Sequence, residues 1–193
     1  AGYSITGNGL GAGIFSENKK NITIKNCKIQ NFSEGIRLGS TTESLLFNNT
    51  VQNNNYGIVL GASSSNNVLE NNIVQNNSYN GFELSEFSNA NVLISNIAQN
   101  NEVGFLLSES SNNILKNNIA QNNEKIKSEF NHAGDGFLII FSSNGNYLEN
   151  NIADNNHHNG FAIEGGFPYP SINNILINNI ASNNDRGFSI DYS

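Results

Sequence analysis

A glycine followed by an apolar, any, apolar triplet recurs along the whole chain, and this repeat constrains the fold more than any other feature. Most successive copies begin 22 to 24 residues apart, at Gly13, Gly35, Gly57, Gly81, Gly104, Gly136, Gly160 and Gly187. A period in the twenties is typical of a solenoid, in which each copy forms one coil and stacks on its neighbours.

The residue types inside each copy indicate strands. Apolar residues alternate over very short runs, and glycine, asparagine and serine fill the segments between them. A leucine-rich repeat is the alternative fold, but its convex helix has no counterpart in the glycine- and asparagine-rich half of each copy. We predict one all-β domain over residues 1–193, a solenoid of about eight coils with insertions near 124–132 and 165–170.

When the copies stack, identical or similar side chains line up in columns. The expected core columns are Phe82, Phe105, Phe137, Phe161 and Phe188, and Leu38, Leu60, Leu84, Leu107, Ile139, Ile163 and Ile190. Because neighbouring coils lie about 4.8 Å apart, buried asparagine amides in the same column can hydrogen-bond to each other. We therefore predict an internal asparagine ladder formed by Asn49, Asn72, Asn96, Asn118, Asn151 and Asn179. Cys27 has the same register one coil earlier, so we expect a small buried thiol rather than a nucleophile.

The residues at several outward-facing positions and the strand edges at both chain ends predict that the protein associates with further chain or with other subunits. Val59, Leu106, Leu138 and Ile140 form an apolar stripe, which is a candidate subunit interface unless Ile126 and Phe130 of the insertion cover it. The chain starts and stops partway through a copy without a capping helix. Open strand edges of this kind predict either more chain beyond the ends or a homo-oligomer or filament built by end stacking.

Charge and composition exclude some partners. The net charge of −7 and the absence of a basic stripe make nucleic acid an unsuitable ligand. No apolar run is long enough to span a membrane. The chain has no methionine and no signal segment, so we expect a mature chain or a fragment of a longer surface protein. Glycosylation sequons at Asn21, Asn31, Asn48 and Asn76 favour an extracellular or cell-surface location.

Chemically reactive side chains gather near the two insertions. Because histidine beside a carboxylate can act as a general base, the candidate catalytic residues are His132, Asp135, His157 and His158. We expect them to converge on one corner of the solenoid. The candidate substrate-binding residues are Asp185, Arg186, Tyr169, Phe167 and Glu164, and the guanidinium of Arg186 suits a uronate carboxylate. The alternative is that these are ordinary polar residues of the turns.

The repeat resembles the right-handed parallel β-helix, and within it the NosD-like repeats that are also described as carbohydrate-binding and sugar-hydrolase repeats. Asp135-Gly136-Phe137, NNIADNNHHNGFAI and PSINNILINNIASNNDRGFSI further resemble the catalytic module of secreted mannuronan C5-epimerases. That resemblance would make His157 or His158 the base. The family's Asp-Pro-His-Glu motif is absent, and Asn159 stands where a histidine would precede the glycine, so the activity does not follow from the resemblance.

The expected function is that of a secreted or cell-surface β-helix with a structural, adhesive or glycan-binding role, whose partner is a polysaccharide or cell-surface glycan. The alternative is a polysaccharide-modifying enzyme, a uronate C5-epimerase or lyase, acting at the histidine corner. We expect no cofactor and no metal site. NosD-like proteins are linked to copper, but a chain with one cysteine and no methionine lacks soft ligands. Calcium binding is left open, although no calcium-binding repeat motif indicates it.

Overall fold

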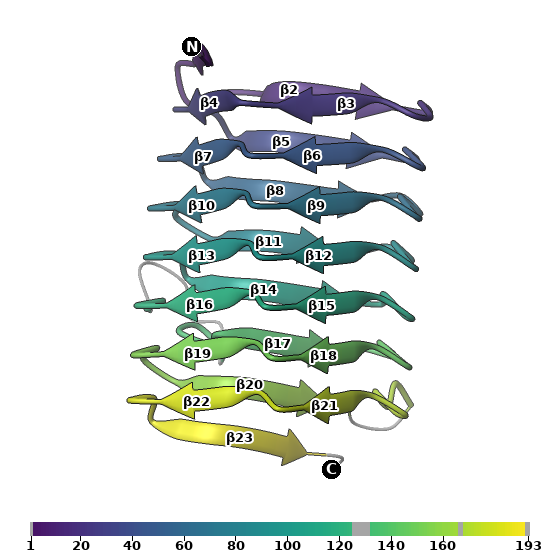
Figure 1. Ribbon diagram of the computed structural model, residues 1–193, viewed down its shortest axis with the longest axis vertical. Helices are drawn as coiled ribbons and strands as arrows, with labels where there is room; N and C mark the ends of the chain where they lie inside the picture. The colour runs from purple at the N-terminus through teal and green to yellow at the C-terminus, as the bar shows by residue number, and fades with distance from the viewer. Residues whose placement is uncertain (1, 125–131, 166–167, 192–193) are drawn as a thin grey trace.

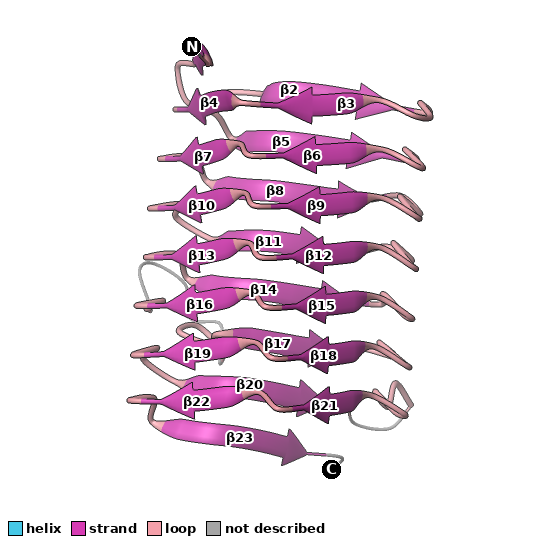
Figure 2. Ribbon diagram, in the orientation of Figure 1, coloured by secondary structure: helices cyan, strands magenta, loops and turns pink. Residues whose placement is uncertain are grey.

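The computed structural model is a parallel β-helix whose coils stack along one long axis (Figure 1). It describes residues 2–124, 132–165 and 168–191. Each complete coil contributes three short strands, and no helix occurs among the described residues (Figure 2). The predicted all-β solenoid of about eight coils is thus confirmed, and the leucine-rich repeat is wrong.

Three parallel sheets run the length of the solenoid, and each takes one strand from successive coils. The long-strand sheet consists of β2 (Ala12–Glu17), β5 (Glu34–Gly39), β8 (Tyr56–Gly61), β11 (Asn80–Leu84), β14 (Val103–Ser108), β17 (Phe137–Ile140), β20 (Asn159–Glu164) and β23 (Arg186–Asp191). The glutamine-row sheet consists of β1 (Tyr3–Thr6), β4 (Cys27–Gln30), β7 (Thr50–Gln52), β10 (Ile73–Gln75), β13 (Ile97–Gln99), β16 (Ile119–Gln121), β19 (Ile152–Asp154) and β22 (Ile180–Ser182). The leucine-row sheet consists of β3 (Thr23–Lys25), β6 (Leu45–Phe47), β9 (Val68–Glu70), β12 (Val92–Ile94), β15 (Ile114–Lys116), β18 (Tyr147–Glu149) and β21 (Ile175–Ile177).

The strand register brings the predicted core columns together. Phe82 pairs with Phe105, Phe105 with Phe137, and Phe137 with Phe161. Consecutive rings in this column lie 4.7 Å apart with nearly parallel planes. All four side chains are buried, and burial of a ring of this size contributes about 2–3 kcal/mol. The column ends in the last coil, where Phe188 is half exposed.

The repeat glycines are required by close packing between coils. A Cβ atom on Gly104 would lie 2.5 Å from the carbonyl oxygen of Gly136 and 3.0 Å from the Cβ of Ala120. No side chain fits at these distances, so the glycine marks the place where each coil turns from the glutamine-row sheet into the long-strand sheet.

The predicted asparagine ladder is present and fully hydrogen-bonded. Asn118 shows the pattern: its Nδ2 donates to Asn151 Oδ1 (3.0 Å) and to the Leu93 carbonyl (2.9 Å). Its Oδ1 accepts from the Asn96 backbone N–H (2.9 Å) and from Asn96 Nδ2 (3.0 Å). The preceding residue, Asn117, has a φ of 55°, a left-handed conformation that asparagine tolerates well. This explains why asparagines occur in pairs.

Two further ladders, which the sequence analysis did not identify, occupy the other corners. One is formed by Asn54, Asn77, Asn101, Asn123, Asn156 and Asn184. The other is formed by Asn67, Asn91, Asn113, Asn146 and Asn174. All three corners of the coil are therefore held by stacked amides inside the solenoid.

Two details of the sequence analysis need correction. The stripe expected to be exposed is buried, with 2% exposure for Val59, 8% for Leu106, 0% for Leu138 and 5% for Ile140. Its predicted cover, Ile126 and Phe130, lies outside the described residues. Cys27 is half-buried rather than buried, although its backbone N–H donates to Asn49 Oδ1 (3.0 Å), as the predicted register requires. The described part of the chain contains no helix with the length and apolarity needed to cross a lipid bilayer.

Candidate functional site

The outer face of the long-strand sheet carries two rows of side chains. One row is formed by the residue that precedes each repeat glycine, and the other by the residue between two core positions. Within a coil the two rows touch: Arg37 Nη1 donates to Glu34 Oε1 (3.0 Å), and Asn80 Nδ2 donates to Glu83 Oε2 (2.8 Å). Successive coils repeat these positions at about 4.8 Å, but the rows are polar only in part, because Val103, Leu106, Leu138 and Ala162 form a buried apolar cluster in β14, β17 and β20.

Asp135 occupies the first row immediately before Gly136, and its side chain is fully buried. Its Oδ1 accepts hydrogen bonds from the Asn159 backbone N–H (2.8 Å) and from His158 Nδ1 (2.8 Å). Because an ionised carboxylate only accepts hydrogen bonds, the contact with Asp135 favours the tautomer in which Nδ1 of His158 carries the proton. In that tautomer the lone pair is on Nε2, and the contact with Asp135 orients the ring.

His132 and Glu164 complete the group. His132 Nδ1 lies 3.6 Å from Asp135 Oδ2, and His132 Nε2 lies 3.2 Å from Glu164 Oε2. The interaction with the Asp135 carboxylate raises the pKa of His132, with a further contribution from the charge of Glu164, while burial opposes both. Burial raises the pKa of Glu164, and the neighbouring His132 partly offsets it. We call His132, Asp135, His158 and Glu164 the Asp135 cluster.

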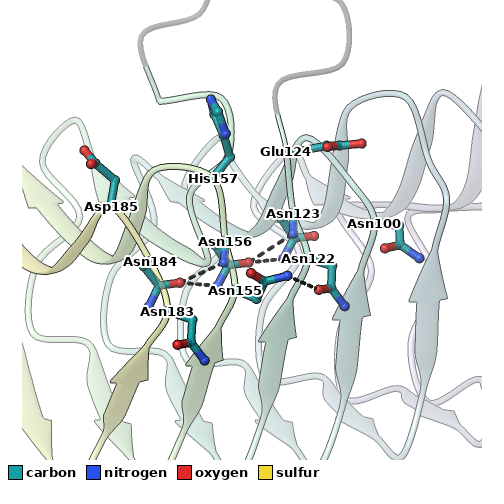
Figure 3. A pocket seen from close by; sticks show the side chains of 10 residues that line it. All are labelled: Asn100, Asn122, Asn123, Glu124, Asn155, Asn156, His157, Asn183, Asn184 and Asp185. Carbon is teal, nitrogen blue, oxygen red and sulfur yellow. Dashed lines mark hydrogen bonds between the residues drawn. The ribbon is translucent and has the colours of Figure 1, made fainter.

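A second concave region lies at the corner between the glutamine-row and long-strand sheets (Figure 3). This corner pocket of about 630 Å³ is lined by Asn100, Asn122, Asn123, Glu124, Asn155, Asn156, His157, Asn183, Asn184 and Asp185. Its floor is formed by rows of amides, in which Asn155 Nδ2 donates to Asn122 Oδ1 (2.6 Å). Figure 3 shows the side chains of Glu124, His157 and Asp185 standing above these rows.

The structure separates the residues that the sequence analysis grouped at one corner. His132, Asp135, His158 and Glu164 meet in the Asp135 cluster, whereas His157 and Asp185 line the corner pocket. Arg186 is exposed and pairs in register with Asn159. Tyr169 is 59% exposed, in the turn that follows β20. Phe167 lies outside the described residues.

Asn159 is a member of the site that the sequence analysis did not identify. Its backbone N–H binds Asp135, and its side-chain amide lies 2.9 Å from His158 Nδ1. The signal was its position before a repeat glycine, which places it in the same outward row as Asp135. In the sequence it stands out only as a departure from an epimerase motif.

Comparison with known proteins identifies the family and related folds. A family profile described as "Periplasmic copper-binding protein (NosD)" matches residues 2–131, about two thirds of the chain. No significant relative was found among curated proteins.

Several solved structures share the fold. The periplasmic alginate epimerase AlgG superposes with a TM-score of 0.72 at 18% identity, covering 93% of this chain and 47% of that one. Pectate lyase Pel9A superposes with a TM-score of 0.62 at 15% identity, covering 90% of this chain and 53% of that one. The A-module of Azotobacter vinelandii mannuronan C-5 epimerase AlgE4 superposes with a TM-score of 0.61 at 13% identity, covering 90% of this chain and 58% of that one. The chain spans about half the length of these structures, and identities this low support the fold alone.

The family description names copper, so the donor set has to be tested against that metal. The chain offers one cysteine and no methionine, which leaves no soft-ligand set for Cu(I). In the Asp135 cluster, three of the four imidazole nitrogens already face carboxylates. Across residues 2–124, 132–165 and 168–191, no group of three or more histidine, cysteine, aspartate or glutamate side chains is arranged to hold a metal ion. These residues do not fit copper, and no step below depends on it.

Proposed function

The chain belongs to the NosD family, and we propose that it acts by binding a polysaccharide along the outer face of the long-strand sheet. The Asp135 cluster carries this proposal, because it places two histidines and two carboxylates together on an otherwise repetitive surface. In support, the family description names a periplasmic protein, and the solved structures with this fold include a periplasmic alginate epimerase and a pectate lyase. We accordingly propose that this protein works outside the cytoplasm.

The hydrogen bonding of the cluster supports a functional role over a structural one. Asp135 Oδ2 is buried and makes no hydrogen bond to the described residues, and it is held by the ion-pair contact with His132 Nδ1 at 3.6 Å. A buried polar group without a partner costs about 1–3 kcal/mol. The internal asparagine ladders show that this fold readily pairs its buried amides. Ser88 Oγ, far from the cluster, is also unpaired within the described part of the chain, so the observation that indicates a role other than stability is the gathering of two histidines and two carboxylates around the buried Asp135.

A second candidate function is acid–base chemistry on the bound polysaccharide, as in a uronate C5-epimerase or lyase. The observation that favours it is the 2.8 Å contact between His158 Nδ1 and Asp135 Oδ1. A buried carboxylate that orients a histidine and stabilises its protonated form is the arrangement expected of a general base. Nε2 of His158 would then accept the proton.

Adjacent histidines provide a matched test of both functions. His158→Ala removes a member of the Asp135 cluster, whereas His157→Ala changes the same residue type in the corner pocket. We expect His158→Ala to weaken binding to a panel of hexasaccharides in calorimetric titrations, and His157→Ala to bind like the wild type. Melting temperatures confirm that both variants are folded. Equal affinities for all three proteins would overturn the proposal.

Activity is measured on the same three proteins. Ultraviolet absorbance detects the unsaturated ends that a lyase produces, and proton NMR detects a change in epimer content. Turnover that is lost in His158→Ala but retained in His157→Ala would establish the second function. Binding without turnover would leave a glycan-binding module.

A further inference from the structure

A smaller cavity lies on the same outer face, closer to the N-terminus than the Asp135 cluster. It has a volume of about 230 Å³ and is lined by Glu34, Arg37, Tyr56, Val59 and Glu83, from β5, β8 and β11. Tyr56 is half-buried, and its ring stacks on that of Tyr79 with centroids 4.9 Å apart and an interplanar angle of 24°. Of these residues, the sequence analysis named only Val59, as part of the apolar stripe.

We propose that this cavity is a second glycan subsite, in which the ring of Tyr56 packs against an uncharged sugar ring. The inference rests on the proposed polysaccharide binding and extends it by naming the sugar class. Stacking on Tyr79 holds the Tyr56 ring in place before any ligand arrives, so little side-chain entropy is lost on binding. An aromatic wall with a few polar groups around it is typical of a small-ligand site.

The charges around Tyr56 disfavour an acidic sugar. Arg37 is the cationic residue of the cavity, and it is already engaged by Glu34 at 3.0 Å and by Glu86 at 3.8 Å. Glu83 adds a further carboxylate, which accepts hydrogen bonds from Asn80 (2.8 Å) and Ser85 (3.1 Å). A uronate carboxylate would meet like charge here. Sugar hydroxyls, in contrast, can donate to these carboxylates.

The tyrosine hydroxyl is also kept in its neutral form. Burial raises the pKa of Tyr56, and the charge of Glu83 adds to the effect. The hydroxyl therefore remains a hydrogen-bond donor and acceptor across the physiological pH range.

The cavity and the Asp135 cluster lie at different coils of the same sheet. Tyr56 begins β8, and Asp135 lies two residues before β17, three strands further along the sheet order β8–β11–β14–β17. At about 4.8 Å per coil, the two sites are roughly 14 Å apart along the axis. The outward side chains Val103 and Leu106 of the intervening strand β14 are buried, so the two sites would contact separate parts of a sugar chain.

The test compares neutral and acidic oligosaccharides of equal length. Cellohexaose and mannohexaose are titrated against hexagalacturonate and hexamannuronate by calorimetry at low and physiological salt. We expect the wild type to prefer a neutral hexasaccharide. Tyr56→Ala should weaken its binding about tenfold, whereas Tyr56→Phe, which keeps the ring, should stay within about threefold. Tyr147→Ala, on the leucine-row sheet, is the matched control and should bind like the wild type.

The outcomes separate this inference from the proposed function. If Tyr56→Ala binds normally while His158→Ala does not, the subsite is wrong and the polysaccharide site at Asp135 stands. If the wild type prefers the uronates, the assignment to uncharged sugars is wrong. If the wild type binds no oligosaccharide of either class, the proposed function fails and the subsite fails with it. Melting temperatures of all variants exclude loss of the fold as the cause.

Discussion

Removing one amide from an internal asparagine ladder should destabilise the solenoid far more than removing an amide from its surface. Asn118 is fully buried, as are its hydrogen-bonding neighbours Asn96 and Leu93. In Asn118→Ala, the backbone N–H of Asn96 loses the acceptor 2.9 Å away, and the carbonyl of Leu93 loses the donor 2.9 Å away.

The expected magnitude follows from counting the groups that are left unpaired. Asn96 Nδ2 keeps its bond to the Leu69 carbonyl (2.8 Å), and Asn151 Oδ1 keeps its bond to the backbone N–H of residue 118 (2.9 Å). Two buried backbone groups remain without partners. At about 2 kcal/mol for each, the substitution should lower the free energy of unfolding by about 4 kcal/mol.

The matched control is Gln121→Ala, in the next strand of the same coil. Its amide donates to Gln99 Oε1 (2.7 Å) at a half-buried outer position, where water can replace the lost partner. We expect this change to cost about 0.5 kcal/mol. Urea unfolding followed by circular dichroism measures the loss of unfolding free energy in both variants, and we expect their m values to be unchanged. A cost for Asn118→Ala no larger than that for Gln121→Ala would refute the role assigned to the ladders.

Two further predictions concern the repeat glycines and the Asp135 cluster. Gly104→Ala should cost about 2 kcal/mol or more, because its Cβ would lie 2.5 Å from the Gly136 carbonyl oxygen, whereas Gly39→Ala meets no atom closer than 3.8 Å and should be neutral. Equal shifts in melting temperature would contradict the packing explanation. His132 has a raised pKa in the folded state, so its stabilising contribution is fully present below its ordinary pKa of 6.5 and is lost as the pH rises through the raised value. The loss of melting temperature in His132→Asn should accordingly be larger at about pH 5.5 than at about pH 8.5, and the opposite order would show that the contact with Asp135 does not stabilise the protonated ring.

The fold could be predicted from the sequence because identical positions in successive coils are neighbours in space. A repeat of glycine and alternating apolar residues therefore specified both the strands and their register, and Phe82 and Phe105 were correctly placed on top of each other. The two additional ladders were missed for a simple reason. Their asparagines, such as Asn77 and Asn91, occur in turns, where asparagine is common without being buried.

The composition of the site was harder to predict, because its histidines lie in bends and turns, where no strand alternation fixes the side-chain directions. His157 and His158 are adjacent in sequence, yet His158 joins Asp135 and His157 lines the corner pocket. Glu164, in contrast, comes from the far end of β20 and reaches His132. Such contacts depend on where loops and strand ends bring side chains, which a repeat pattern does not encode.

The central claim, that the outer face of the long-strand sheet binds polysaccharide, is tested most directly by an NMR titration. Uniformly ¹⁵N-labelled protein is titrated with the hexasaccharide that binds best, and the amide shifts are mapped on the three sheets. We predict that the shifts concentrate at Asp135, Asn159 and Tyr56, while the amides of Gln99 and Gln121 on the glutamine-row sheet stay unchanged. Shifts confined to the glutamine-row sheet or the corner pocket would contradict the claim.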